Sequence, residues 1–351
     1  MSSTTMTPLP MEGGFPQSLQ PFPLAGTDNL LALRKTKSRG KHLLVASIAS
    51  LTAMCLLAVI IFHGYVAWML AYPFVAPLSS NPKAAIGLDY EDVVFPSKSG
   101  NTTVSGWFIP ADADVSEPAQ SVRTVVFSHG YGANREETWV PMYELSKMLH
   151  GLNYNILLFD YGYASKEYKA PATGGLEESQ QLLAAVDYAK SRGADDIVVW
   201  GFSMGAGTAL QAALQTDEID AMILDSLFIP SPEALFDNLN QFITLPRFSL
   251  PLIESLIPLW TGTSFGSIPA DQVISNEYDI PLYVIHGTND VKAPYKTAEA
   301  VAADQGNQLS RTWIVPDGQH ELLFKVHPRE YIQRAALFLS QVDQQLQTDR
   351  A

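Results

Sequence analysis

The pentapeptide at 201–205, Gly-Phe-Ser-Met-Gly, constrains this chain more than any other stretch. Residues 196–200, just before it, form a mostly apolar run without polar alternation, which predicts a parallel strand covered on both faces. Residues 206–214 are rich in small side chains and predict a helix that packs closely on a sheet. A serine at such a turn projects its hydroxyl above the sheet, and the two glycines remove side chains that would collide there. Ser203 is therefore the candidate nucleophile, with an ordinary strand-to-helix turn as the alternative.

Composition predicts one large acidic domain. The 351 residues are 47% hydrophobic, which is enough for a substantial core. The net charge of −14 is uneven, because residues 1–42 carry five Lys or Arg against two Asp or Glu, so that the remainder holds 17 more acidic than basic residues. An acidic domain repels phosphate backbones, and we therefore expect no nucleic-acid partner.

An uncharged stretch near the N-terminus predicts a membrane anchor. Residues 43–82 contain no Asp, Glu, Lys or Arg, and their first part predicts one transmembrane helix over 43–70. The preceding basic cluster predicts a cytoplasmic N-terminus and an extracytoplasmic main domain, in a single-pass protein of the cell membrane. A cleaved signal peptide fits less well, because the segment before the apolar region and the apolar region itself are both longer than in signal peptides. A buried core helix is a further alternative. His63 and Trp68 are expected near the outer interface, and Cys55, the only cysteine, is expected to be an inert residue in the span.

The segments on either side of this span differ in composition. Residues 1–42 predict a disordered basic cytoplasmic tail, since the first 29 are rich in Ser, Thr, Pro and Gly without apolar periodicity. Residues 71–85 contain three prolines and predict a linker that lifts the domain off the membrane. The globular domain is expected over 86–351.

Strands and helices alternate through this domain. A hairpin is expected from 90–95 and 103–109, and the alternation after it predicts an α/β fold, in which helices flank a mostly parallel sheet. Right-handed crossovers then bring the loop-bearing strand ends to one edge. Further strands are predicted at 123–128, 155–159, 196–200, 221–224, 282–285 and 311–315, and helices at 139–150, 176–191, 204–215, 295–303 and 328–346.

One interval, 226–279, is too long for a simple connection between the sixth and seventh strands. It predicts a small lid of short helices above the edge of the sheet. Its apolar residues either line an acyl pocket or fill the core of the lid. They are Phe236, Phe242, Phe248, Leu252, Ile257, Trp260 and Phe265.

A serine hydroxyl needs a base to accept its proton, and the base needs an acid to hold it. Six of the seven histidines have other expected places: in or beside the membrane span, at a helix end, before a proline, or before a glycine at a strand end, where they shape a turn. These are His42, His63, His150, His327, His129 and His286. His320, in the loop after the last predicted strand, is the candidate base.

Asp290 is the candidate acid, because it follows a predicted strand end on the same edge and precedes His320 in the chain. Asp225 also ends a predicted strand and is the competitor, although it could simply accept hydrogen bonds from local amides. Asp317 and Glu321 lie close to His320 in sequence and are weaker alternatives.

Acyl transfer further needs hydrogen-bond donors aimed at the developing oxyanion. Met204 supplies one backbone N–H at the start of its helix. The second is expected from the backbone of Tyr131, in the loop that follows His129 and Gly130. A plain glycine turn is the alternative for that loop.

Together these motifs resemble the α/β-hydrolase superfamily. The matching segments are His-Gly-Tyr-Gly at 129–132, Asp-Tyr-Gly-Tyr at 160–163, Gly-Phe-Ser-Met-Gly at 201–205, His-Gly-Thr-Asn-Asp at 286–290 and Gly-Gln-His at 318–320. Within the superfamily the chain is similar to membrane-anchored bacterial serine hydrolases related to monoglyceride lipases and prolyl-oligopeptidase-like enzymes. Two departures are a shortened turn after residue 160, and Tyr131 in place of Gly or Asn, which puts a side-chain contribution to the oxyanion hole in doubt.

The resemblance implies a carboxylesterase-like or lipase-like serine hydrolase that acts on a small-molecule acyl substrate. Ser203 would form the acyl-enzyme, His320 would act as base and then as acid, and Asp290 would orient His320. We expect no metal or organic cofactor, because no ligand spacing or phosphate-binding glycine loop occurs. The alternatives are a serine peptidase with the same acyl-enzyme chemistry, and a catalytically silent hydrolase fold used as a membrane-tethered binding module.

Overall fold

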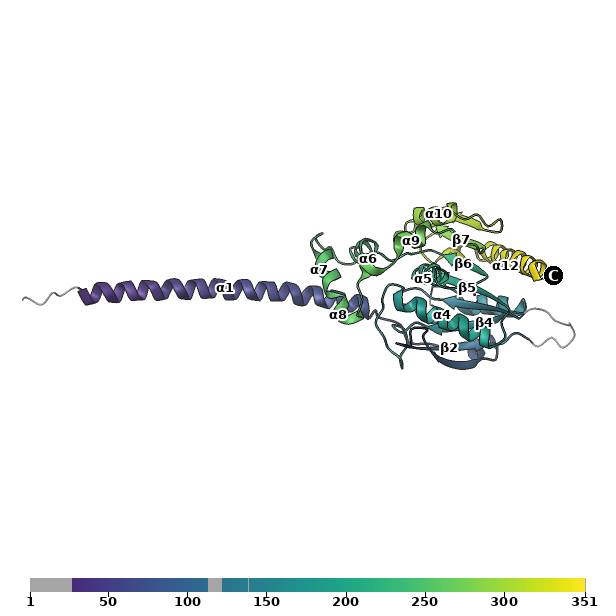
Figure 1. Cartoon of the computed structure of the whole chain (residues 1–351), viewed down its shortest axis with the longest axis horizontal. Coiled ribbons are helices and arrows are strands. Elements are labelled where there is room, and N and C mark those ends of the chain that lie inside the picture. Colours follow the sequence, from purple (N-terminus) through teal and green to yellow (C-terminus); the bar gives the residue numbers. More distant parts are fainter. Residues whose placement is uncertain (1–26, 113–121, 138, 351) are drawn as a thin grey trace, which may run out of the picture. The chain divides into compact units, whose positions relative to one another are not determined.

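The structure, a computed structural model, describes residues 27–112, 122–137 and 139–350, with the backbone alone for 27–38. Within these residues eight strands form one sheet, in the order β1-β2-β4-β3-β5-β6-β7-β8 (Figure 1). β1 and β2 form an antiparallel hairpin, β2 is also antiparallel to β4, and the other neighbours are parallel, so the predicted mostly parallel sheet is confirmed. The strands are β1 (Glu91–Pro96), β2 (Thr103–Ile109), β3 (Arg123–Ser128), β4 (Asn155–Asp160), β5 (Asp196–Phe202), β6 (Ala221–Asp225), β7 (Leu282–Gly287) and β8 (Arg311–Val315).

Helices cover both faces of the sheet. Successive residues of β3 alternate between two cores, with Val126 in one and Val125 and Phe127 in the other. A strand that is buried on both faces must be apolar throughout, which explains the unbroken apolar runs of the central strands. The first core includes residues of α4 (Leu176–Ser191), α5 (Met204–Ala213) and α10 (Tyr295–Ala303), and the second includes residues of α3 (Met142–Gly151), α11 (Leu323–Val326) and α12 (Pro328–Arg350).

The N-terminal helix α1 (Thr27–Ala71) begins before the predicted span. The tail predicted to be disordered up to residue 42 is helical from Thr27, because Leu, Ala, Arg and Lys in this segment all have high helix propensity. Residues 1–26 of that tail lie outside the described part of the chain. Within the described part, Arg39–Ala71 is long and apolar enough to cross a membrane.

The chain divides into two compact units after Val59, and the last turns of α1 belong to the second unit. There Val66, Ala67 and Ala71 are buried in a cluster with apolar residues of the segment between β6 and β7. His63 was expected at a membrane interface but is buried, with Nε2 2.9 Å from Oγ of Ser249. A polar ring on an otherwise apolar helix face thus has a hydrogen-bonding partner within the globular unit.

The predicted linker, 71–85, lies against the domain rather than forming a free spacer. The carboxylate of Glu136 accepts the backbone N–H groups of Ser79 and Ser80, and the side chain of Asn134 donates to the carbonyl of Ala76 at 2.8 Å. The segment ends in the short helix α2 (Pro82–Ile86). Backbone groups that bind buried side chains fix a proline-containing segment whose composition alone indicates an extended spacer.

The interval between β6 and β7 consists mainly of short helices, as predicted for the lid. Four of its phenylalanines differ in burial: Phe236 and Phe265 are buried with the end of α1, whereas Phe242 and Phe248 are 79% and 62% exposed. The buried set therefore fills the core of the lid. The helices are α6 (Pro232–Leu239), α7 (Ser249–Leu256), α8 (Pro258–Thr261), η1 (Phe265–Ser267) and α9 (Ala270–Ser275).

Candidate active site

Ser203 occupies the sharp turn between β5 and α5, with φ 51° and ψ −120°. This conformation is unfavourable for a residue with a side chain, and it persists only where the surroundings fix it. A methyl group on Gly205 would lie 2.1 Å from the carbonyl oxygen of Ser128, and one on Gly201 would lie 2.6 Å from Cα of Ala206. Both glycines are thus required by close backbone approach, which holds the serine at the carboxyl edge of the sheet.

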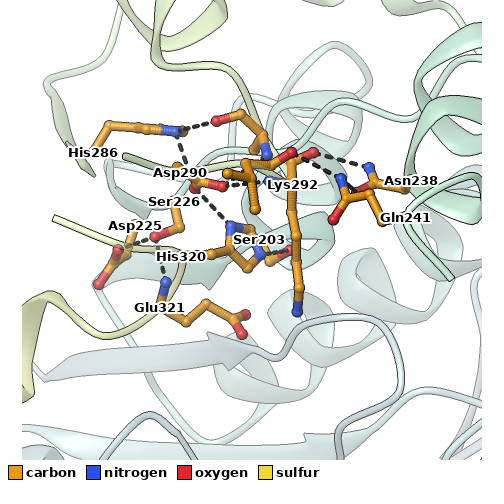
Figure 2. Close-up of polar contacts among 12 residues, drawn as sticks. Ser203, Asp225, Ser226, Asn238, Gln241, His286, Asp290, Lys292, His320 and Glu321 are labelled. Carbon is orange, nitrogen blue, oxygen red and sulfur yellow. Dashed lines mark hydrogen bonds and ion pairs between the residues drawn. The ribbon is translucent and has the colours of Figure 1, made fainter. Parts of the chain in front are cut away.

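Three side chains that are distant in sequence meet at this edge. Nε2 of His320 lies 2.8 Å from Oγ of Ser203, and Nδ1 of His320 lies 2.6 Å from Oδ2 of Asp290 (Figure 2). Asp290 follows β7 and His320 follows β8, so the parallel strands bring both loops beside the turn after β5. The arrangement can transfer a proton from the hydroxyl to the imidazole, with the carboxylate selecting the ring tautomer.

The loop that carries Asp290 is held by its own hydrogen bonds. Oδ1 of Asp290 accepts the backbone N–H groups of Lys292 and Ala293 at 2.9 and 2.8 Å. Nε2 of His286 lies 3.2 Å from Oδ2 of Asp290 and 2.7 Å from the carbonyl of Ala293. Burial alone would raise the pKa of Asp290, but hydrogen bonds from His286 and His320 outweigh it and hold that pKa below its ordinary value. Asp290 is therefore ionised and suited to pairing with an imidazolium.

The other acids that the sequence offered have different surroundings. Asp225 is buried, where it accepts hydrogen bonds from the hydroxyls of Tyr331 and Ser226 at 2.7 and 2.9 Å. Asp317 is exposed and lies 3.2 Å from the amide nitrogen of Asn289. Among the four candidates, Asp290 is thus the one whose carboxylate contacts His320.

Two backbone N–H groups are of interest: that of Tyr131, in the loop after β3, and that of Met204, at the start of α5. No acceptor among the residues that the structure describes takes either group. The carbonyl of Gly130 accepts from the ring of His129 and, at 3.0 Å, from the hydroxyl of Tyr163, which fixes the peptide before Tyr131. The Tyr131 hydroxyl donates to the carbonyl of Leu70 at 2.7 Å. Its phenol is therefore bound to the end of α1, and the backbone is the part of Tyr131 that remains able to donate.

His129 is a structural residue of this loop. It is fully buried, and Nε2 accepts the backbone N–H of Tyr161 at 3.1 Å while Nδ1 donates to the carbonyl of Gly130. Desolvation lowers the pKa of His129 to about 4, so the ring is neutral and its tautomer is fixed by these two contacts. The predicted turn-shaping role fits this geometry.

The site is largely covered. Ser203 is 8% exposed and the His320 side chain 9%. Two amides near the end of α6 bind the loop that carries the acid: Asn238 donates to the carbonyl of Lys292 and Gln241 to that of Val291, both at 2.9 Å (Figure 2). The lid is thus hydrogen-bonded directly to the catalytic loop.

Sequence reasoning missed several residues of this site. His286 was interpreted only as a turn former, although it lies at the end of β7, four residues before Asp290, and its ring contacts the Asp290 carboxylate. Glu137 was not considered, and its buried carboxylate accepts the backbone N–H of Gly130 at 3.0 Å. In the described part of the chain, no cluster of three or more His, Cys, Asp or Glu side chains could hold a metal ion.

Comparisons with known proteins agree with this fold. A family model described as alpha/beta hydrolase fold matches residues 123–270. The chain is 27% identical over 233 residues to the uncharacterized protein YfhR of Escherichia coli K12, covering 66% of this chain and 73% of that protein. It is 25% identical over 185 residues to lysophosphatidylserine lipase ABHD12 of Macaca fascicularis, covering 51% and 44% of the two chains. A solved esterase structure from Pyrococcus furiosus superposes with a TM-score of 0.59 at 25% identity, covering 77% of this chain and 98% of the esterase.

Proposed function

We propose that this chain, which belongs to the α/β-hydrolase superfamily, is a serine hydrolase that cleaves carboxylic esters or related acyl compounds. The observation that carries the proposal is the continuous hydrogen-bonded path from Ser203 through His320 to Asp290, with 2.8 and 2.6 Å between the paired atoms. A serine with a base at this distance, and an ionised acid behind that base, is the arrangement that nucleophilic acyl transfer requires.

The first half-reaction forms the acyl-enzyme. Nε2 of His320 accepts the proton of Ser203 as Oγ attacks the substrate carbonyl, and the negative charge of Asp290 stabilises the imidazolium. The proton then moves from Nε2 to the leaving alcohol as the carbon–oxygen bond breaks. In the second half-reaction His320 takes a proton from water, the hydroxyl attacks the acyl carbon, and Ser203 is released with its proton restored.

The backbone N–H groups of Tyr131 and Met204 would stabilise the tetrahedral oxyanion in both steps. Preorganised donors of this kind contribute because they need no reorientation as charge develops. The hydrogen bonds to the Gly130 carbonyl keep the first donor in place before substrate binds. The start of α5 supplies the second with the favourable end of its helix dipole.

Two findings favour an ester over a peptide as substrate. Two of the similar proteins have a stated activity, one as an esterase and one as a lysophosphatidylserine lipase. The lid also carries exposed aromatic side chains, Phe242 and Phe248, which suit an apolar acyl chain better than a polar peptide backbone. We therefore place the chain among carboxylesterases and lipases, with the acyl length set by how far these residues approach the bound substrate.

Hydrolysis of p-nitrophenyl esters of increasing acyl length, compared with aminoacyl p-nitroanilides, tests this function. We expect ester hydrolysis that is lost in Ser203→Ala, with a preference for medium or long acyl chains. Preference for short chains would assign the lid aromatics to packing alone. Anilide hydrolysis that exceeds ester hydrolysis would assign the enzyme to the peptidases instead.

We also propose that α1 anchors the enzyme in the cell membrane with a cytoplasmic N-terminus, because Arg39–Ala71 is apolar and basic residues precede its uncharged part. Replacing Cys55 by Ala leaves no cysteine, so that single cysteines can report sidedness. A membrane-impermeant maleimide should label Thr348→Cys but not Ser3→Cys on intact cells with an accessible cytoplasmic membrane. The reverse pattern would place the catalytic domain in the cytoplasm.

A further inference from the structure

Two glutamates that the triad does not use lie beside the nucleophile. Glu137 follows β3 and Glu321 follows His320, and they are only 3% and 4% exposed. A methyl group on Gly130 would lie 2.6 Å from Oε1 of Glu321, 3.6 Å from Oε2 of Glu137 and 3.4 Å from Cβ of Ser203. Both carboxyl groups therefore approach the same point on the backbone of the oxyanion loop.

Each of these carboxyl groups has an oxygen without a partner. Oε1 of Glu137 and Oε1 of Glu321 are buried and accept no hydrogen bond from the residues that the structure describes. Oε2 of Glu137 accepts the backbone N–H of Gly130. Buried polar atoms nearly always have a hydrogen-bonding partner. Two ionised carboxylates at a buried site of low dielectric constant also repel each other. A single proton held between the two groups would remove both difficulties.

The charged and titratable groups around the pair come from every neighbouring loop: Lys292 after β7, His320 after β8, Asp225 at the end of β6, and Tyr163 after β4. Figure 2 shows the Lys292 side chain reaching past Ser203 toward the level of the Glu321 carboxyl group. Burial raises the pKa of Glu137 to about 8, against the opposing effects of the Gly130 hydrogen bond and of Lys292. Burial and then the charge of Glu137 raise the pKa of Glu321 to about 8, against the opposing effects of His320 and Lys292. Burial and repulsion thus exceed the effect of the lysine.

We propose that Glu137 and Glu321 share one proton at neutral pH and act as a positioning pair for the oxyanion loop, an inference that rests on the proposed hydrolase function. The shared proton gives both Oε1 atoms a partner and leaves Oε2 of Glu137 free to hold Gly130. The pair then carries one negative charge. When that proton is lost to solvent, a second negative charge faces the place where the substrate oxygen becomes negative, and acyl transfer slows.

The pH dependence of kcat/KM for a p-nitrophenyl ester, measured on the full chain in detergent, tests the effect on the reaction. We expect the wild type to lose on the order of tenfold between pH 7 and about 9.5, because a second charge near the oxyanion disfavours the transition state. Glu321→Gln should lose no more than about twofold over the same range, since the amide cannot ionise. The control Asp317→Asn removes an exposed charge from the same loop and should retain the wild-type alkaline loss. An alkaline loss as large in Glu321→Gln as in the wild type, or no loss in the wild type, would overturn the proposal.

Infrared spectroscopy of inactive chains tests the shared proton without relying on catalysis. Ser203→Ala at neutral pH should show a carbonyl stretching band of a protonated carboxyl group that weakens as the pH rises through about 8 and is largely lost by about pH 9, one unit above the raised pKa. The double variants Ser203→Ala/Glu321→Gln and Ser203→Ala/Glu137→Gln should both lose that band, while any contribution of buried Glu178 cancels in the difference spectra. An unchanged band in the variants that fold excludes the shared proton. Absence of ester hydrolysis by the wild type would instead refute the hydrolase function. The infrared test of the shared proton would still stand, because it does not depend on activity.

Discussion

Asp290 binds His320 with one carboxylate oxygen and its own loop with the other. Oδ2 lies 2.6 Å from Nδ1 of His320, whereas Oδ1 accepts the N–H groups of Lys292 and Ala293. This division means that the acid is oriented by its loop independently of the histidine. Loss of the Asp290 charge should therefore change the tautomer of the His320 ring while the loop that carries residue 290 stays in place.

Replacement of Asp290 by Asn should lower kcat by on the order of 10³ to 10⁴, with KM little changed, because the amide favours the wrong tautomer of His320. Steady-state ester hydrolysis measures this. Asp225→Asn provides the matched comparison, since Asp225 contacts Tyr331 and Ser226 rather than His320. It should cost less than about tenfold in kcat and act mainly on stability. Equal losses in the two variants would contradict the assignment of the acid.

Gly205→Ala should destabilise the fold, because the added methyl group would lie 2.1 Å from the backbone oxygen of Ser128. Overpacking of this kind costs at least about 1–3 kcal/mol, and here backbone rather than a flexible side chain must move. Gly151→Ala, at the end of α3, places its methyl group in open space and should leave the melting temperature almost unchanged. Thermal unfolding of the two variants measures the difference. Equal melting temperatures would show that the backbone at residue 205 can move away from that of Ser128 without loss of stability.

The stability of the globular unit should depend on pH through His129. Its pKa is lowered to about 4 by burial, below the value of about 6.5 in an unfolded chain. The unfolded state therefore binds the proton first, so that this stability contribution is complete above pH 6.5 and is lost as the pH falls toward 4. The free energy of unfolding should fall by up to about 1.4 kcal/mol per pH unit in that window on account of this residue.

Chemical denaturation between pH 4.5 and 7.5, followed by tryptophan fluorescence, measures this slope. His129→Asn should show a shallower dependence than the wild type, whatever its absolute stability. Slopes that coincide would mean that the ring is protonated in the folded protein.

The hydrogen bonds of Asn238 and Gln241 to the acid loop should hold the lid over Ser203. Replacing both residues by Ala removes two hydrogen bonds, each worth about 1 kcal/mol, and should increase the rate of fluorophosphonate labelling by up to about thirtyfold. Gln272→Ala on α9 changes an exposed lid amide and serves as the control. A labelling rate that stays at the wild-type value in the double variant would mean that the lid opens without breaking these contacts.

Much of the architecture follows from local sequence. The strand at 311–315 and the helices at 176–191 and 295–303 have the predicted bounds, because apolar periodicity and clear ends coincide there. β5 runs on to Phe202, beyond the predicted end, since the apolar run continues into the turn. The N-terminal helix was predicted too short because, in the sequence alone, a basic segment of high helix propensity resembles a solvated tail.

The contacts between distant loops were less accessible to sequence reasoning. Ser203, Asp290 and His320 each follow a strand, and the shared edge of a parallel sheet predicts that they meet. By contrast, Glu137 and Glu321 carry no motif, and their approach to Gly130 depends on side-chain directions in two loops. The docking of the proline-containing segment on Glu136 also depends on pairing between residues far apart in the chain.

Mass spectrometry after fluorophosphonate treatment tests the central claim most directly, because the reagent reacts only with a serine that its surroundings have activated. We predict one covalent adduct per chain, mapped to the peptide that contains Ser203, absent in Ser203→Ala and strongly slowed in His320→Gln. An adduct on another residue, or labelling of His320→Gln at the wild-type rate, would contradict the proposed catalytic triad.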